Sequence, residues 1–148
     1  MSRSNRNRER LTEAQRLERI CKEYQVPSKE ELVRLILHPT AERFNELLDR
    51  TKAFIQRRAK KISTSQIRNI FARIKSAQQE QDLYRLRPLL AYAAGRATKE
   101  QEQDALSDLT VLMDTLIREV KTSEDVRRFQ EFSEALVAYH RYFNPKES

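Results

Sequence analysis

The amino-acid sequence predicts an all-α protein, a small bundle of about five to seven helices, and two observations support this fold class. Apolar residues recur at helical spacing along almost the whole chain, and alternation of apolar and polar residues is nowhere sustained. The 148 residues include one glycine and four prolines, which are too few turn residues for hairpins or a sandwich. A chain of this length is most simply one domain.

We expect three parts: a disordered basic arm at residues 1–10, a single helical-bundle domain at residues 11–144 and a C-terminal tail at residues 145–148. The arm contains four arginines but is not followed by the apolar segment of a signal peptide. No run of about 18 apolar residues is present, which argues against a membrane-spanning helix. The single cysteine cannot form an internal disulfide. These features predict a cytoplasmic protein.

The first helix is expected to start at Thr12 and to end before Pro27. Thr12 followed by Gln15 resembles a capping box, in which two side chains bond to each other's backbone N–H groups. The later helices also begin at residues that cap well and end at prolines or polar clusters. Their expected starts are Ser28, Thr40, the Ser63-Thr64-Ser65 cluster and Ser123. The expected ends are His38–Pro39, the same serine–threonine cluster for the helix that starts at Thr40, Gly95 and Pro145.

Two segments lie between the serine–threonine cluster and the last helix. Residues 82–96 contain Pro88, which either opens a short helix or kinks a longer one. Gly95 suits the position just after the end of that helix, where a left-handed conformation is common. Apolar residues at 105–120 then predict a sixth helix.

Positive charge is concentrated in one window. Residues 50–79 hold nine Lys or Arg and no Asp or Glu, although the whole chain has a net charge of +7. Such a patch attracts a polyanion, and nucleic acid is the commonest one. A solvated face that keeps the protein soluble, or ion pairs with acidic residues of other helices, would also explain it.

At 100° per residue, the basic residues of this window fall in rows beside the apolar faces of two helices. Arg50, Arg57 and Lys61 form one row on the third helix, with Lys60 on its far side. Arg68 and Lys75 line one edge of the fourth. Backbone N–H groups at the polar turn between the helices would add an anion site. Rows of this kind predict contact with a phosphate backbone without sequence reading.

Arg58 falls toward the apolar face, where we expect its stem to pack while its guanidinium extends to solvent. His140 is expected to be packed or capping rather than a catalytic base. A row of four acidic residues is interpreted as a solvated helix face rather than a metal site: Glu100, Glu102, Asp104 and Asp108. No P-loop, dinucleotide fingerprint or zinc cluster is present in the sequence. We therefore expect a binding protein without catalytic residues, cofactor or metal.

Three segments together resemble the small subunit of the type III-A CRISPR effector, the Csm complex. They are ISTSQIRNIFARIK (62–75), LRPLLAYAAGR (86–96) and FSEALVAYHRYF (132–143), and the similarity spans about residues 50–144. The resemblance implies a non-catalytic helical bundle for antiviral defence, present in several copies that stack along the inner face of the complex. It also implies contact with guide (crRNA) and target RNA beside the backbone, large polymerase-like and end-capping subunits.

By position in these segments, Lys60, Lys61, Arg68 and Arg96 are the contacts that the resemblance implies. Together with the rows, the predicted nucleic-acid-binding residues are Arg50, Arg57, Lys60, Lys61, Arg68, Lys75 and Arg96. Small residues at 91 and 93–95 would allow close approach of two helices or two subunits, and packing within the chain is the simpler interpretation. The alternatives are a stand-alone basic helical protein that binds RNA or DNA, and an adaptor whose basic rows dock acidic helices.

Overall fold

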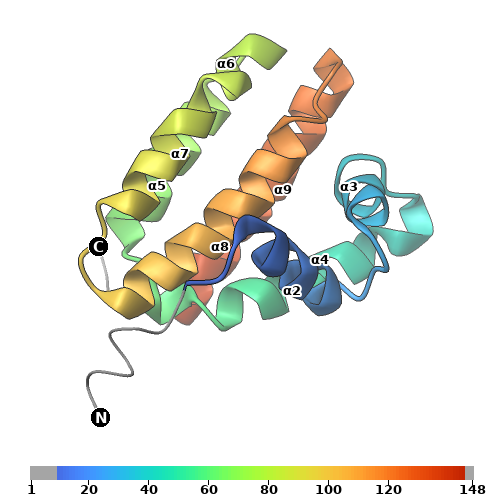
Figure 1. Cartoon of the computed structure of the whole chain (residues 1–148). Coiled ribbons are helices and arrows are strands. Elements are labelled where there is room, and N and C mark those ends of the chain that lie inside the picture. The colour runs from blue at the N-terminus through green and yellow to red at the C-terminus, as the bar shows by residue number, and fades with distance from the viewer. Residues whose placement is uncertain (1–9, 146–148) are drawn as a thin grey trace.

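The computed structural model describes residues 10–145, which form a helical bundle with no β-strand in that range (Figure 1). The helices are α2 (Glu13–Glu23), α3 (Lys29–Leu37), α4 (Ala41–Gln56), α5 (Thr64–Lys75), α6 (Glu80–Tyr84), α7 (Leu86–Gly95), α8 (Glu100–Ile117) and α9 (Ser123–Phe143), with one 3-10 turn, η1 (Ala59–Lys61). The all-α prediction is confirmed. The expected basic arm and C-terminal tail lie, except for Arg10 and Pro145, outside the described residues.

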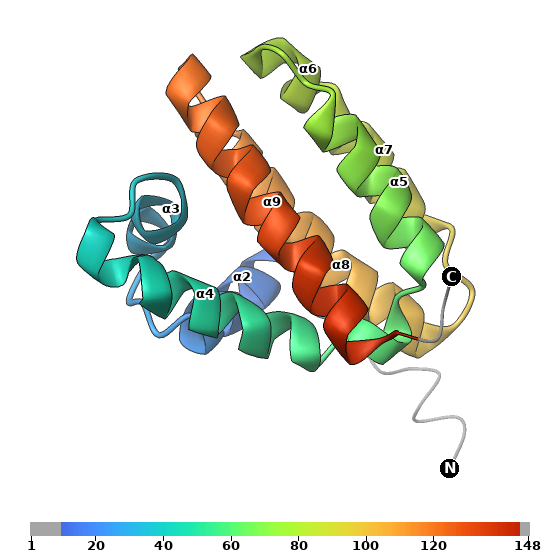
Figure 2. The ribbon, with the colours of Figure 1, turned by 180° about the vertical axis from the view of Figure 1, so that it is seen from behind.

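The two longest helices, α8 and α9, form the centre of the molecule. Helices α2 and α7 pack on α8, whereas α3, α4 and α5 pack on α9. As a result, α5, α6 and α7 lie along one side of the central pair and α2, α3 and α4 lie on the other, as both views show (Figures 1 and 2). One apolar core connects all of these helices, with Tyr24, Phe54 and Phe129 among its fully buried side chains. None of the described helices is long and apolar enough to cross a membrane.

The expected helix starts agree closely with the structure. The Thr12 hydroxyl accepts a hydrogen bond from the Gln15 N–H at 3.1 Å, and the Gln15 side chain accepts one from the Thr12 N–H at 2.8 Å, so the capping box is confirmed. Ser28, Thr40 and Ser63 cap α3, α4 and α5 as expected. The cap of α9 is Thr122 rather than Ser123, because Thr122 forms a capping box with an acidic residue three positions on.

The prediction that the helix from Thr40 continues to the serine–threonine cluster is wrong. Helix α4 ends at Gln56, and the chain then forms η1. This break buries Ala59 and Ile62, whose carbonyls are bound by side chains of the last helix and its cap. The Asn144 amide donates to the Ala59 carbonyl at 3.1 Å, and His140 Nε2 donates to the Ile62 carbonyl at 2.8 Å.

The segment around Gly95 also differs from expectation. Helices α6 and α7 meet at Arg85, and Pro88 lies in the first turn of α7, so it opens a short helix. Gly95 is the last residue of α7 and has no left-handed conformation, so the prediction that it follows the helix end is wrong. A Cβ atom added there would meet no atom within 4 Å, so close packing inside this chain does not explain the glycine.

Candidate nucleic-acid interface

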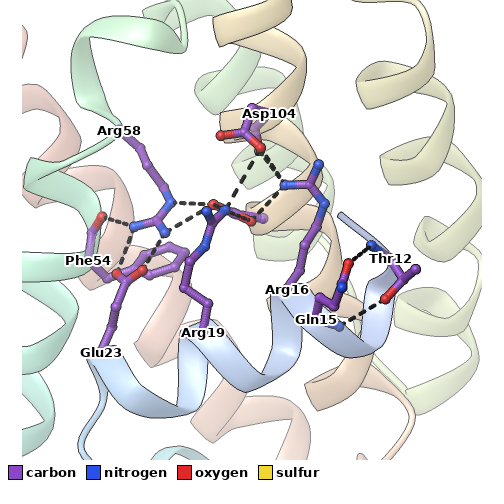
Figure 3. A network of polar contacts seen from close by, with 9 residues as sticks. Thr12, Gln15, Arg16, Arg19, Glu23, Phe54, Arg58 and Asp104 are labelled. Carbon is purple, nitrogen blue, oxygen red and sulfur yellow. Dashed lines mark hydrogen bonds and ion pairs between the residues drawn. The ribbon is translucent and has the colours of Figure 1, made fainter. Parts of the chain in front are cut away.

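Arg58 is buried in an ion cluster, and the expectation that its guanidinium extends to solvent is wrong. The residue is 5 % exposed, and its guanidinium donates two hydrogen bonds to the Glu23 carboxylate, at 2.9 and 2.6 Å (Figure 3). It also donates to the Asp108 carboxylate at 3.0 and 3.1 Å and to the Phe54 carbonyl at 2.7 Å. Two carboxylates from α2 and α8 therefore compensate a charge that the helical wheel correctly placed toward the core.

Asp108 is the centre of this cluster and is 2 % exposed. Its carboxylate also accepts hydrogen bonds from Arg16 at 2.9 Å and from Arg19 at 2.7 and 2.8 Å. The interpretation of the acidic row as a solvated face is therefore wrong for this residue. Burial opposes ionisation, but the hydrogen bonds from Arg19 and Arg16 and the charge of Arg58 outweigh it and lower the pKa of the Asp108 carboxyl. Among residues 10–145, no group of His, Cys, Asp and Glu side chains is arranged to hold a metal ion.

The ion cluster forms the floor of an open cleft of about 450 Å³ between α2, η1 and α8. Arg57 and Lys61 line this cleft, although the break after α4 means that they do not share one helix with Arg50. The predicted row of Arg50, Arg57 and Lys61 on one helix is therefore wrong. Two cleft residues from α2, Arg19 and Lys22, were missed because residues 11–49 are acidic overall.

Two of the predicted contact residues already have acidic partners. Arg50 is half-buried, donates to the Gln25 side chain at 2.9 Å and lies 3.8 Å from the Glu46 carboxylate. Arg57 is exposed, but its guanidinium lies 3.3 Å from the Glu23 carboxylate. The alternative of ion pairs with other helices thus holds for Arg57 and Arg58.

The other five predicted residues are exposed and form no ion pair with any residue in the described range. They are Lys60, Lys61, Arg68, Lys75 and Arg96. We call the first four of them, which follow one another from η1 to the end of α5, the basic row. The turn before α5 is less open to anions than expected, because Ser63 and Gln66 cap each other and the Gln66 amide donates to the Glu102 carboxylate at 2.9 Å.

Arg96 lies apart from the basic row, in a second hollow between α5 and α7 with a volume of about 650 Å³, which we call the α5–α7 groove. Its lining includes Arg73, Leu89 and Tyr92 and no acidic residue. Tyr92 is 65 % exposed and Leu89 is 43 % exposed. The Arg96 guanidinium lies 5.8 Å from the centre of the Tyr92 ring. Tyr92 lies outside the basic window, residues 50–79, so the charge pattern of the sequence contains no signal for it.

Comparison with known proteins gives one family. The family model described as Csm2 Type III-A matches residues 41–146, which include α4 to α9 and the whole basic row. Comparisons with curated proteins and with solved structures give no match.

Proposed function

The chain belongs to the Csm2 Type III-A family and is therefore a small subunit of the type III-A CRISPR effector, and we propose that it binds the sugar–phosphate backbones of paired guide and target RNA. The proposed contacts are the basic row, Arg57 beside Lys61 in the cleft, and Arg96 in the separate α5–α7 groove. In this proposal the protein is non-catalytic and cytoplasmic. Several copies stack along the inner filament, beside the backbone, large polymerase-like and end-capping subunits.

The observation that carries the proposal is that the cations of the basic row are exposed and have no acidic partner in the described part of the chain. Lys60, Lys61, Arg68 and Lys75 are exposed and form no ion pair with residues 10–145. Several other surface arginines pair with nearby acids, as Arg43 does with Glu46 at 3.1 Å. The window that holds the row, residues 50–79, itself contains no carboxylate, which would pair with these cations and repel phosphate. Four free cations that follow one another along the chain suit a ligand with repeating negative charge.

Backbone contact without base reading also suits an RNA-guided complex. Pairing between guide and target reads the sequence in such complexes, so the protein can bind any duplex through its phosphates. Lysine and arginine, which make up the basic row, are the usual contacts to phosphate and carry no sequence information when they bind it.

Combined substitution of three row residues tests this proposal. We expect Lys60→Ala, Lys61→Ala and Arg68→Ala together to weaken binding of single-stranded RNA by the full-length chain, measured by fluorescence anisotropy over a salt series. The logarithm of affinity should fall less steeply with salt, by about 0.7 log units per log salt for each phosphate that the variant no longer neutralises.

A matched control removes the same charge elsewhere: Lys29→Ala, Lys121→Ala and Arg127→Ala change three exposed cations on α3, on the loop before α9 and on α9. If both triple variants lose affinity equally, only net charge matters and the proposed surface is wrong. Binding of the other Csm subunits without any dependence on RNA would favour the adaptor alternative.

A further inference from the structure

The exposed face of α7 carries two large apolar side chains that the fold does not use. Leu89 and Tyr92 are three residues apart, so they lie on one face of the helix, and both border the α5–α7 groove. Large exposed apolar residues are scarce in the described part of the chain, where the others are Leu11 and Tyr142. A pair of them beside a hollow indicates a binding surface.

The charges around this groove indicate the kind of ligand. Arg73 comes from α5 and Arg96 follows α7, so a cation is contributed from each helix that forms the groove. Neither guanidinium forms an ion pair with residues 10–145. No carboxylate lines the groove. An exposed aromatic ring in one groove with two free cations suits a ligand with a flat apolar part and anionic groups next to it.

A nucleotide within a single strand has this chemistry. Its base can stack on an aromatic ring, and the phosphates before and after it can contact arginines. A second copy of this chain fits less well, because its exposed face would have to present acidic groups to both arginines. Two of the exposed carboxylates, Glu124 and Glu131, are already paired with arginines of their own helix, α9.

We propose that the α5–α7 groove binds one unpaired nucleotide of RNA, with its base against Tyr92 and its flanking phosphates at Arg73 and Arg96. The inference rests on the proposed function, which supplies the RNA, and extends it with a second mode of contact. The basic row binds phosphates of any strand, whereas the groove requires a base that is free to leave the stack. The protein therefore binds RNA that contains unpaired nucleotides more tightly than a fully paired duplex.

The test uses the full-length chain and two RNA ligands. One is a single strand with 2-aminopurine at its centre, whose fluorescence falls when the base stacks, and the other is the same strand in a fully paired duplex. We expect binding to quench the single strand. Tyr92→Leu should abolish the quenching and weaken single-strand binding about tenfold, or about 1.4 kcal/mol, while duplex affinity stays within twofold. Tyr92→Phe keeps the ring and should behave as the wild type.

The outcomes separate this inference from the proposed function. Loss of single-strand binding in Tyr92→Leu, with normal binding in the Lys60, Lys61 and Arg68 triple variant, supports the groove and overturns the basic row as the phosphate surface. The reverse pattern overturns the groove and leaves the basic row intact. Equal losses for single strand and duplex in Tyr92→Leu would also overturn the groove. So would loss of self-association in sedimentation with unchanged RNA binding, which would assign the face to a second copy. Because Tyr92 is exposed, Tyr92→Leu should fold normally, which circular dichroism checks.

Discussion

At the scale of single residues, Asp108 is the shared hydrogen-bond acceptor of the ion cluster beneath the cleft. Three guanidinium groups, from Arg16, Arg19 and Arg58, hydrogen-bond to its carboxylate. Removing that one negative charge would leave three guanidinium groups with only the Glu23 and Asp104 carboxylates as acidic partners in the cluster. A broken buried ion pair is costly because the remaining partner stays desolvated.

Asp108→Asn tests this role. We expect the free energy of unfolding, measured by urea denaturation at pH 7, to fall by about 3–5 kcal/mol. Glu131→Gln is the matched control, because Glu131 lies on the exposed side of α9 and its 3.4 Å contact with Arg128 is a surface ion pair. Surface pairs contribute about 0–1 kcal/mol, so this variant should unfold close to the wild type.

The pH dependence of unfolding provides a second measurement on the same residue. The folded state lowers the pKa of Asp108 below its ordinary value of 3.8. A lowered pKa gives stability that is fully present above 3.8 and is lost as pH falls through the folded-state pKa. The Asn variant cannot titrate there, so the stability difference between the two proteins should shrink below pH 3.8. A difference that is constant down to pH 2 would show that Asp108 does not contribute through its charge.

The sequence could place Arg58 on the apolar side of its helix but could not supply its partners. Glu23 and Asp108 are 35 and 50 residues away in the chain, and no local pattern links them. The same limit made Asp108 look like one member of a solvated acidic row. Lys60, Lys61 and Lys75 are exposed. The break after α4 sets the position of the first two, and their contact with RNA stays a prediction.

At the scale of elements, helix starts could be predicted and one important helix end could not. Caps such as Thr12, Ser28 and Thr40 act through hydrogen bonds within three residues, so the sequence contains the whole signal. The end of α4 depends instead on α9, whose His140 and capping Asn144 bind carbonyls of the turn after α4. This tertiary contact decides where Lys60 and Lys61 lie.

His140→Ala should therefore disturb both stability and the position of η1. The substitution leaves the buried Ile62 carbonyl without the His140 N–H, which should lower the free energy of unfolding by about 1–3 kcal/mol. We also expect faster hydrogen exchange at the backbone amides of residues 59–62, measured by mass spectrometry.

Arg141→Ala is the control, because Arg141 is the exposed neighbour of His140 on the same helix. If His140→Ala exchanges as slowly as the control in this segment, the histidine is merely a packed side chain and does not hold the turn. A loss of stability without faster exchange would lead to the same conclusion.

At the scale of the whole molecule, the residues that the family model matches do not include all of the residues that form the folded core. The match begins at residue 41, whereas the core also includes Ile20, Tyr24 and Leu32, each with no exposed surface. Composition and spacing could predict a single all-α bundle because every helix has an amphipathic pattern. They could not predict that α2 closes the ion cluster, because that depends on side chains of α2 and α8 meeting Arg58 in the turn after α4.

A chain reduced to residues 41–148 should consequently fail to form the native bundle. The truncation removes Glu23, which hydrogen-bonds to Arg58, and Arg16 and Arg19, which bind Asp108. It also uncovers the apolar surface that Ile20 and Tyr24 cover in the core. We expect a loss of cooperative unfolding in urea and reduced helix content by circular dichroism, because unpaired buried charges and reduced apolar burial act together. Removal of residues 1–9 alone is the control, since it leaves every interaction among residues 10–145 in place and should preserve the transition. A cooperative transition of unchanged midpoint in the 41–148 chain would show that the family-matched segment folds by itself and that α2 and α3 are an addition to a complete domain.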